Sequence, residues 1–262
     1  MQDKIRQKAR ELLSSGAVKV VIGYGEGTGS RVRALFIQKP EDADRLIMDE
    51  RCVQNLAVYL TKHEVRAIGK PAIVARMHVI RSINQLTYEE QFNEGDIAVI
   101  GISDSNEIVD LPDLKSIKEY AAGNPLVLTA EEKADLGKLE TMTREERWNY
   151  WIEELSNCIK CYACRASCPM CYCPRCTVEV NQPQWISVPA HEIGNVEWHI
   201  MRAMHLAGRC VNCGECTRAC PVKIPLRLLN QRIIADIAVN FGQSEEYALA
   251  AFNPNDKEDF IR

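Results

Sequence analysis

The chain carries two cysteine runs of the same spacing, Cys158-Ile159-Lys160-Cys161-Tyr162-Ala163-Cys164-Arg165-Ala166-Ser167-Cys168-Pro169 and Cys210-Val211-Asn212-Cys213-Gly214-Glu215-Cys216-Thr217-Arg218-Ala219-Cys220-Pro221. Each run reads C-x2-C-x2-C-x3-C-P. Three thiolates this close in the chain can bind three irons of one [4Fe–4S] cubane. The proline then ends the turn, because its ring fixes φ and it has no N–H. Two such runs predict two [4Fe–4S] clusters and favour them over paired zinc sites.

The fourth cysteine of each run is expected to bind the cluster of the other run. In two-cluster bacterial ferredoxins with this spacing, the fourth thiolate ligates the second cluster. We therefore expect one cluster on Cys158, Cys161, Cys164 and Cys220, and the other on Cys210, Cys213, Cys216 and Cys168.

Composition and charge argue against a nucleic-acid-binding, secreted or membrane-spanning protein. The 262 residues carry a formal net charge of −4 at pH 7, which argues against a nucleic-acid partner. The first ten residues lack the apolar segment of a signal peptide, and no apolar run reaches the length of a membrane span. Eleven of the twelve cysteines lie between residues 158 and 220. This confinement is typical of cofactor ligands in a reducing compartment, so we expect a cytoplasmic protein.

Residues 1–140 predict an α/β domain with a mostly parallel sheet, because strand patterns alternate with helical ones. The expected strands cover residues 17–22, 31–37, 71–75 and 96–101, and the expected helices cover 2–13, 50–61, 79–90 and a segment after Pro112. The glycine-rich stretch 23–29 leads into a strand-like segment. We therefore interpret it as a hairpin turn, since a phosphate-binding loop needs a helix behind it.

Residues 141–262 predict an α-helical ferredoxin domain with two [4Fe–4S] clusters. The polar stretch 123–142 marks the junction, and a capping box at Thr143 begins a helix that runs into the first cysteine run. A second helix, over residues 196–207, runs into the second cysteine run, so the order indicates an internal duplication. Between residues 158 and 232 there are nine Lys and Arg but four Asp and Glu. This basic surplus would offset the negative charge of clusters, although a solvated basic face is the alternative.

Four cysteines remain after two cubanes are filled, namely Cys52, Cys171, Cys173 and Cys176. The last three form a C-x-C-x2-C turn, and with Cys52 they would supply the ligands of a third iron–sulfur cluster. The alternatives are a zinc or other metal site and uncommitted thiols, with Cys52 as a small buried residue on a helix. The five histidines form no H-E-x-x-H pattern, so we do not expect them to be metal ligands.

Four stretches in the first half of the chain carry a family resemblance: Val20-Val21-Ile22-Gly23, Asp49-Glu50-Arg51-Cys52-Val53-Gln54-Asn55-Leu56-Ala57, Lys70-Pro71-Ala72-Ile73-Val74-Ala75 and Ile97-Ala98-Val99-Ile100-Gly101. Through them, residues 18–130 resemble the coenzyme F420 hydrogenase/dehydrogenase beta-subunit family. The segments 161–165 and 171–176 are similar to those of iron–sulfur subunits in heterodisulfide reductase-like, formate dehydrogenase or hydrogenase complexes of anaerobes. The resemblance implies a subunit of such a complex.

These observations predict an electron-transfer subunit without a catalytic site of its own. It would relay electrons between a flavin- or metal-containing catalytic subunit and a second carrier. An alternative is a self-contained flavin-dependent reductase with FAD in the N-terminal domain. The chain has Arg76-Met77-His78 where family members often carry a Gly-Cys-Asp loop, so the family's flavin and deazaflavin functions are not transferred to it. A structural adaptor with zinc in both runs is the third alternative.

Overall fold

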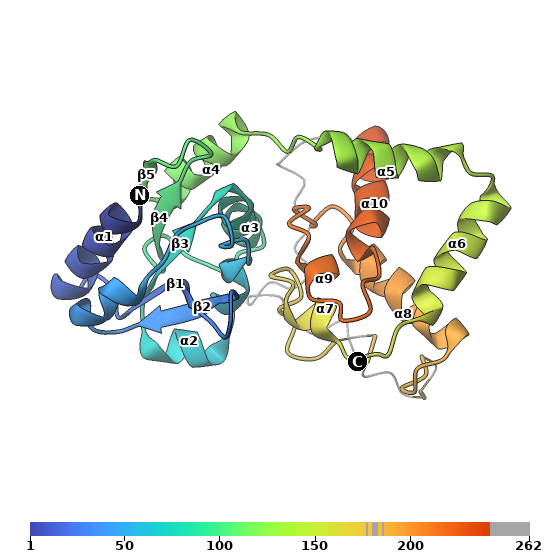
Figure 1. The fold of residues 1–262 in the computed structure, drawn as a ribbon, viewed down its shortest axis with the longest axis horizontal. Coiled ribbons are helices and arrows are strands. Elements are labelled where there is room, and N and C mark those ends of the chain that lie inside the picture. The colour runs from blue at the N-terminus through green and yellow to red at the C-terminus, as the bar shows by residue number, and fades with distance from the viewer. Residues whose placement is uncertain (177, 180–182, 185, 242–262) are drawn as a thin grey trace, which may run out of the picture. The chain divides into compact units, whose positions relative to one another are not determined.

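The computed structural model describes residues 1–241 other than 177, 180–182 and 185. The chain divides between Pro125 and Leu126 into two compact units, here called unit 1 and unit 2 (Figure 1). This division lies inside the polar stretch 123–142. None of the described helices is long and apolar enough to cross a membrane.

Unit 1 is built on a five-stranded sheet of order β2-β1-β3-β4-β5. The strands are β1 (Val20–Glu26), β2 (Val32–Ile37), β3 (Pro71–Ala75), β4 (Ala98–Ile102) and β5 (Ile108–Leu111). β1, β3 and β4 run parallel, whereas β2 and β5 pair antiparallel at the two edges. Both edge strands follow loops too short for the crossover that a parallel pair needs. The sheet is therefore mixed, and the expected parallel arrangement is found only among its three central strands.

The helices of unit 1 cover the sheet. They are α1 (Gln2–Ser14), α2 (His63–Ile68), α3 (Met77–Tyr88) and α4 (Leu114–Gly123), with short 3₁₀ turns η1 (Pro40–Arg45) and η2 (Leu56–Tyr59). Figure 1 shows α1 on one side of the sheet and α3 with α4 on the other. The predicted hairpin after β1 is confirmed, and its turn is closed by the Gly27 N–H, which donates to the Arg31 carbonyl at 2.8 Å.

The helix expected over residues 50–61 was wrong, because only the short turn η2 forms there. The side chain of Asn55 accepts from the Ala57 N–H at 3.2 Å and donates to Ser82 Oγ at 2.8 Å. Asparagine that bonds its own backbone in this way competes with a helix and caps a short turn instead. Cys52 therefore lies in the irregular segment before η2, where it is fully buried.

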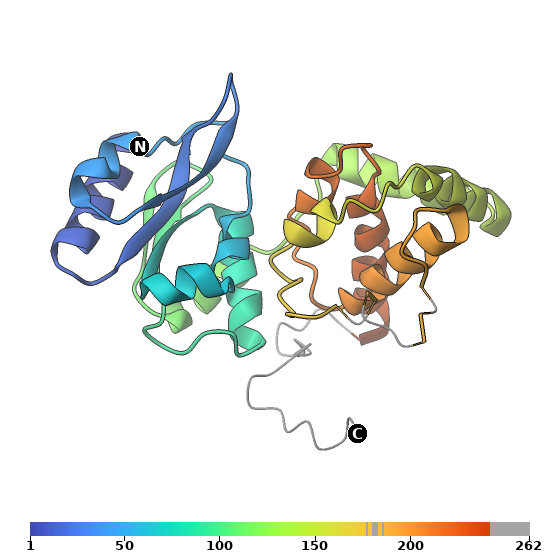
Figure 2. The same ribbon diagram turned by 90° about the horizontal axis from the view of Figure 1, so that it is seen from below.

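Unit 2 is helical over its described residues (Figures 1 and 2). The helices are α5 (Ala130–Thr141), α6 (Arg144–Ser156), α7 (Ala163–Ala166), α8 (Glu192–His205), α9 (Glu215–Arg218) and α10 (Leu226–Phe241). The capping box predicted at Thr143 is confirmed at the start of α6. Along α6, Leu155 is buried whereas Trp148 is 54% exposed.

The sequence did not predict α5, which lies in the polar stretch. Thr129 and Glu132 form a capping box at its start. Glu132 also pairs with Arg227 and accepts from Gln231 at 3.3 Å, so the polar face of α5 is held against α10 by charged and amide contacts. An apolar periodicity would miss such a helix.

The central strand β3 should dominate the stability of unit 1, because all five of its residues are buried. Ile73 is fully buried, and Ile73→Ala should cost about 2–5 kcal/mol through lost burial and a cavity. Hydrogen exchange of the β1 and β3 amides should then accelerate about 30-fold or more, at ~1.4 kcal/mol for each tenfold. Val53→Ala is the matched control, since Val53 is 44% exposed. Equal exchange in the two variants would contradict this core assignment.

Candidate metal centre

The two cysteine runs of unit 2 have the same backbone conformation. Residues with positive φ occur at matching places, at Lys160 (49°) and Tyr162 (59°) in the first run and at Asn212 (56°) and Gly214 (76°) in the second. The short helices α7 and α9 each begin directly after the second of these residues. The fourth cysteine N–H then donates to a helix carbonyl at 3.2 Å in both runs, Cys168 to Arg165 and Cys220 to Thr217. The predicted internal duplication is thus present in the backbone.

The left-handed residues turn backbone N–H groups toward the first thiol of each run. The Lys160 N–H donates to Cys158 Sγ at 3.3 Å. In the second run burial raises the pKa of Cys210 most, whereas a backbone hydrogen bond from Asn212 lowers it. Left-handed conformations are costly for residues other than glycine, so their repetition indicates a shared constraint. N–H groups directed at sulfur stabilise the thiolate that a metal requires.

The fourth cysteine of each run lies near the thiols of the other run. Burial raises the pKa of Cys158, and the charges of Cys161 and Cys220 raise it further. A hydrogen bond with Cys171 raises the pKa of Cys168 most, followed by burial, with the charge of Cys213 also contributing. Cys220 therefore lies near Cys158, and Cys168 near Cys213, which is compatible with the crossed ligand sets.

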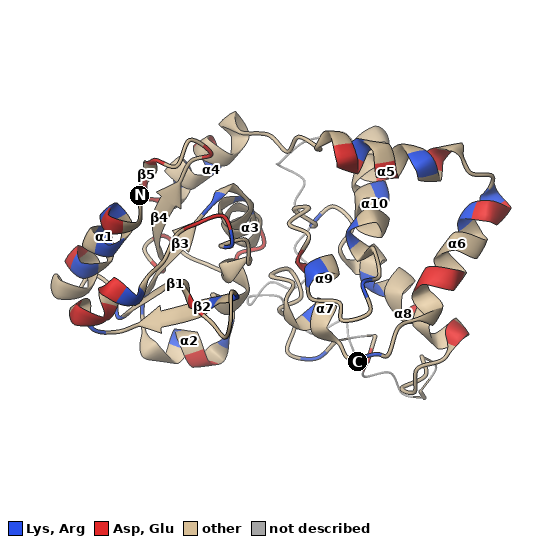
Figure 3. Ribbon diagram, viewed as in Figure 1, with Lys and Arg blue, Asp and Glu red and all other residues tan. Residues whose placement is uncertain are grey.

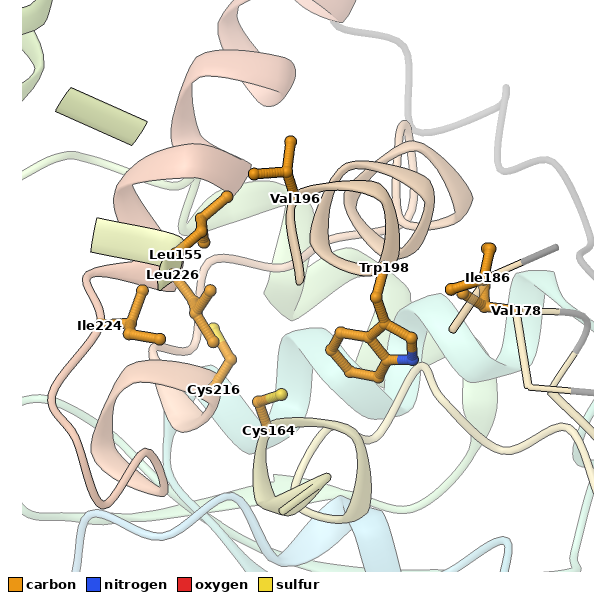
Figure 4. Close-up of a cluster of buried hydrophobic side chains, with 9 residues drawn as sticks. All are labelled: Leu155, Cys164, Val178, Ile186, Val196, Trp198, Cys216, Ile224 and Leu226. Carbon is orange, nitrogen blue, oxygen red and sulfur yellow. The ribbon is translucent and has the colours of Figure 1, made fainter. Parts of the chain in front are cut away.

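Two of the inner thiols lie in the apolar core of unit 2. Cys164 and Cys216 belong to one cluster of buried side chains with Leu155, Val178, Ile186, Val196, Trp198, Ile224 and Leu226 (Figure 4). Burial raises the pKa of Cys164 to about 12. Without a metal these thiols are neutral, so metal binding here must release protons.

Arg202 of α8 lies among thiols of both runs although it is only 5% exposed. Its Nη2 donates to the Cys164 carbonyl at 3.0 Å. Burial lowers the pKa of Arg202, but the net shift is upward because of the negative charge that Cys171, Cys168, Cys164 and Cys216 carry when ionised. A buried cation in this position offsets negative charge in the interior of the unit.

The buried face of α8 carries a stripe of polar residues that sequence reasoning missed. Asn195, His199 and Arg202 are 1%, 3% and 5% exposed and follow each other at i, i+4 and i+7. Asn195 Nδ2 donates to the carbonyls of Leu155 (3.2 Å) and Cys158 (2.9 Å), so it ties α8 to the start of the first run. The signal in the sequence is a polar stripe at helical spacing directly before a cysteine run.

Among the described residues, which include all twelve cysteines, no group of three or more Cys, His, Asp or Glu side chains could hold a single metal ion. A zinc ion needs its four ligand atoms within ~2.0–2.3 Å of one centre, whereas each thiolate of a cubane binds a different iron. The two alternatives therefore place different demands on the arrangement of the thiols.

The remaining cysteines are divided between the units. Cys171, Cys173 and Cys176 line a cavity of about 360 Å³ in unit 2. Cys52 belongs to unit 1, where its Sγ accepts from the Asp49 N–H at 3.4 Å. A third site that joins Cys52 to the three other thiols stays a prediction.

Comparison with known proteins finds relatives of part of the chain. Over 99 residues, 37% of this chain, it is 34% identical to the F420-dependent formate dehydrogenase subunit beta of Methanocaldococcus jannaschii. Over 83 residues, 28% of the chain, it is 32% identical to the F420-dependent formate dehydrogenase 1 subunit beta of Methanococcus maripaludis. The matches cover 24% and 21% of those proteins, so the chain spans a quarter or less of their length. No family model matches the chain. The resemblance to beta subunits is thereby confirmed over the matched residues.

Asn195→Ala should loosen the start of the first cysteine run. The substitution leaves two carbonyls without their amide donor, at a cost of about 1–3 kcal/mol. Amide exchange in the segment after Cys158 should accelerate about fivefold or more in the full chain. Asn157→Ala is the control, because among the described residues the exposed Asn157 side chain bonds only to carbonyls in the last turn of α6. The same small effect in both variants would contradict the role given to Asn195.

Proposed function

We propose that this chain is an iron–sulfur subunit of an oxidoreductase complex, and that it relays electrons through two [4Fe–4S] clusters in unit 2. The observation that carries the proposal is the pair of cysteine runs with one backbone conformation, each with its fourth thiol near the other run. The names of the relatives, which are subunits of formate dehydrogenases, support a place in a redox complex.

The residues around the cysteines fit such clusters. One cluster would be held by Cys158, Cys161, Cys164 and Cys220, and the other by Cys210, Cys213, Cys216 and Cys168. Three buried N–H donors of the described part of unit 2 have no acceptor there, namely Arg202 Nε, Trp198 Nε1 and Asn212 Nδ2. Buried donors without partners are rare, and thiolate and sulfide atoms would accept from them. When bound, each cluster supplies one-electron oxidation and reduction.

Arg202 would set the electrostatics of both sites. Its guanidinium lies among thiols from both runs, so its charge acts on both ligand sets. A fixed positive charge favours the reduced, more negative state of a nearby cluster and so raises its reduction potential. Lys and Arg also outnumber Asp and Glu between residues 158 and 232, so the net charge of this segment is positive, like that of Arg202 (Figure 3).

The aromatic side chains of unit 2 would keep water from the first run. Trp198 is 3% exposed, and its ring centroid lies 5.4 Å from that of Tyr162, the left-handed residue between Cys161 and Cys164. Burial and limited solvent access are among the features by which a protein sets a cluster's potential. These rings therefore contribute to both packing and redox tuning.

Unit 1 would dock on other subunits of the complex. The proposed partners are flavin- or metal-containing subunits of heterodisulfide reductase-like, formate dehydrogenase or hydrogenase complexes. The alternative of an FAD-dependent reductase has less support. A cavity of about 560 Å³ in unit 1 lies at the amino ends of β3 and β4, lined by Pro71 and Ile97. Nucleotides in open α/β sheets bind at the carboxyl ends of strands. Stoichiometric FAD in the purified chain would favour the alternative.

If the ligand sets are crossed, loss of the fourth cysteine of one run should damage the cluster of the other run. Cys220→Ala should perturb the cluster of Cys158, Cys161 and Cys164, because it removes that cluster's fourth thiolate. Cys168→Ala should perturb the cluster of the second run. Electron paramagnetic resonance (EPR) of the reduced full chain measures both, and Cys52→Ser is the control that should change neither. Loss of the second-run signal in Cys220→Ala, with the first intact, would show that each run keeps its own fourth cysteine.

Removing the charge of Arg202 should lower both potentials. Arg202→Gln should shift each by roughly 50–100 mV toward negative values, the effect of one charge at ~8 Å and an effective dielectric constant of ~20. Arg202→Lys keeps the charge and should recover most of the shift. Redox titration followed by EPR measures the potentials. Equal potentials in all three proteins, or equal shifts for Gln and Lys, would mean that Arg202 acts by packing alone.

A further inference from the structure

We propose that unit 2 binds a third iron–sulfur cluster through Cys171, Cys173, Cys176 and His205, all of which line one cavity, and that Cys52 is not a ligand. This site uses none of the eight thiols of the two-cluster relay, so it goes beyond the proposed function. It also revises the sequence-based expectation that no histidine is a metal ligand.

The cavity has the size and lining of a site for a multi-atom group. Its volume is about 360 Å³, many times the ~10–15 Å³ that a single water needs in a cavity. A cluster in which each thiolate binds its own iron would use three thiols in such a space.

The three thiols lie within six residues of one another in the chain and line one cavity. All three side chains are half-buried, and Cys176 also packs against the apolar core of unit 2. They line the cavity and are not members of the ligand sets assigned above.

Basic side chains line the same cavity and would neutralise an anionic cluster. They are Arg165, Arg175, Arg202 and Arg209. Two of them also hold the cysteine loop in place. Arg209 Nη2 donates to the Met170 carbonyl at 3.0 Å and its guanidinium lies over the Tyr172 ring, while Arg165 Nη2 donates to the Cys173 carbonyl at 3.4 Å. Positive charge and a fixed loop are what a cluster with three thiolates requires.

His205 is the residue of the cavity lining best suited to a fourth ligand. It is the last residue of α8, one turn after Arg202, and both side chains line the cavity. Imidazole replaces thiolate on iron in some natural clusters. The same helix would therefore bring both a ligand and a compensating charge.

Cys52 is the fourth cysteine left after two cubanes are filled, but it is unsuited to be a ligand of the third cluster. It is fully buried in the core of unit 1, and its Sγ accepts from a backbone N–H of its own loop. Burial raises its pKa, which disfavours the thiolate. A cysteine of this kind behaves as a small apolar residue.

The third site would adjoin the relay through a direct contact. Cys171 is hydrogen-bonded to Cys168, which belongs to the ligand set of the second run. One electron leaving that neighbouring cluster would reduce the third by one electron, with no bond made or broken and no further reactant. The three sites would then form a chain within unit 2.

The test is iron content of the anaerobically reconstituted full chain. Three cubanes predict about twelve irons per chain, and Cys173→Ser and Cys176→Ser should each reduce this to about eight. Cys52→Ser should keep about twelve, and His205→Cys should keep the iron but change the EPR signal of one cluster. Because a serine variant could misfold, the EPR signals of the two relay clusters are recorded in each variant and should persist.

Several outcomes would overturn the proposal. They are about eight irons in the wild-type chain, loss of iron in Cys52→Ser, zinc in the cavity in place of iron, and an EPR spectrum unchanged by both His205→Cys and His205→Ala. Failure of the proposed function would look different. In that case, substitution of Cys158 or Cys210 would leave the iron content of the chain unchanged, whether or not the third site holds iron.

Discussion

The proposed exchange of fourth cysteines between the two runs is the constraint on which unit 2 would depend. With Cys220 in the ligand set of the first run and Cys168 in that of the second, neither set would be complete within its own segment. The helices that deliver them, α7 and α9, have four residues each and cannot be stable alone. Buried thiols such as Cys164 are also held neutral until a metal displaces their protons. Folding of unit 2 and cluster binding are therefore expected to be one coupled process.

Helix α8 connects packing to electrostatics. Its Asn195 fixes the entry to the first run, Trp198 covers that run, and Arg202 places a cation among thiols of both. The side chains lie on one helix face, so a shift of α8 would change hydrogen bonding, water exclusion and charge together. This coupling explains why a polar stripe persists in a buried position where apolar residues would pack at lower desolvation cost.

Much of this architecture follows from the sequence, because spacing and local chemistry decide it. The cysteine runs, the capping box at Thr143 and the strand over residues 71–75 depend on neighbouring residues alone. The elements that the sequence did not predict correctly depend on contacts between residues far apart in the chain. Asn55 bonds Ser82 of a distant helix and ends the expected helix, and α5 is held by Glu132 pairing with Arg227. The role of Arg202 is equally non-local, since the thiols around it come from two segments.

The most direct test of the central claim is a crystal structure of the iron-loaded chain, grown anaerobically and phased on the iron signal. The account predicts two cubanes, with Cys220 Sγ on an iron of the cluster bound by Cys158, Cys161 and Cys164. Cys168 Sγ should lie on an iron of the cluster bound by Cys210, Cys213 and Cys216. Iron bound to Cys158, Cys161, Cys164 and Cys168 together, or one zinc ion in each run, would contradict it.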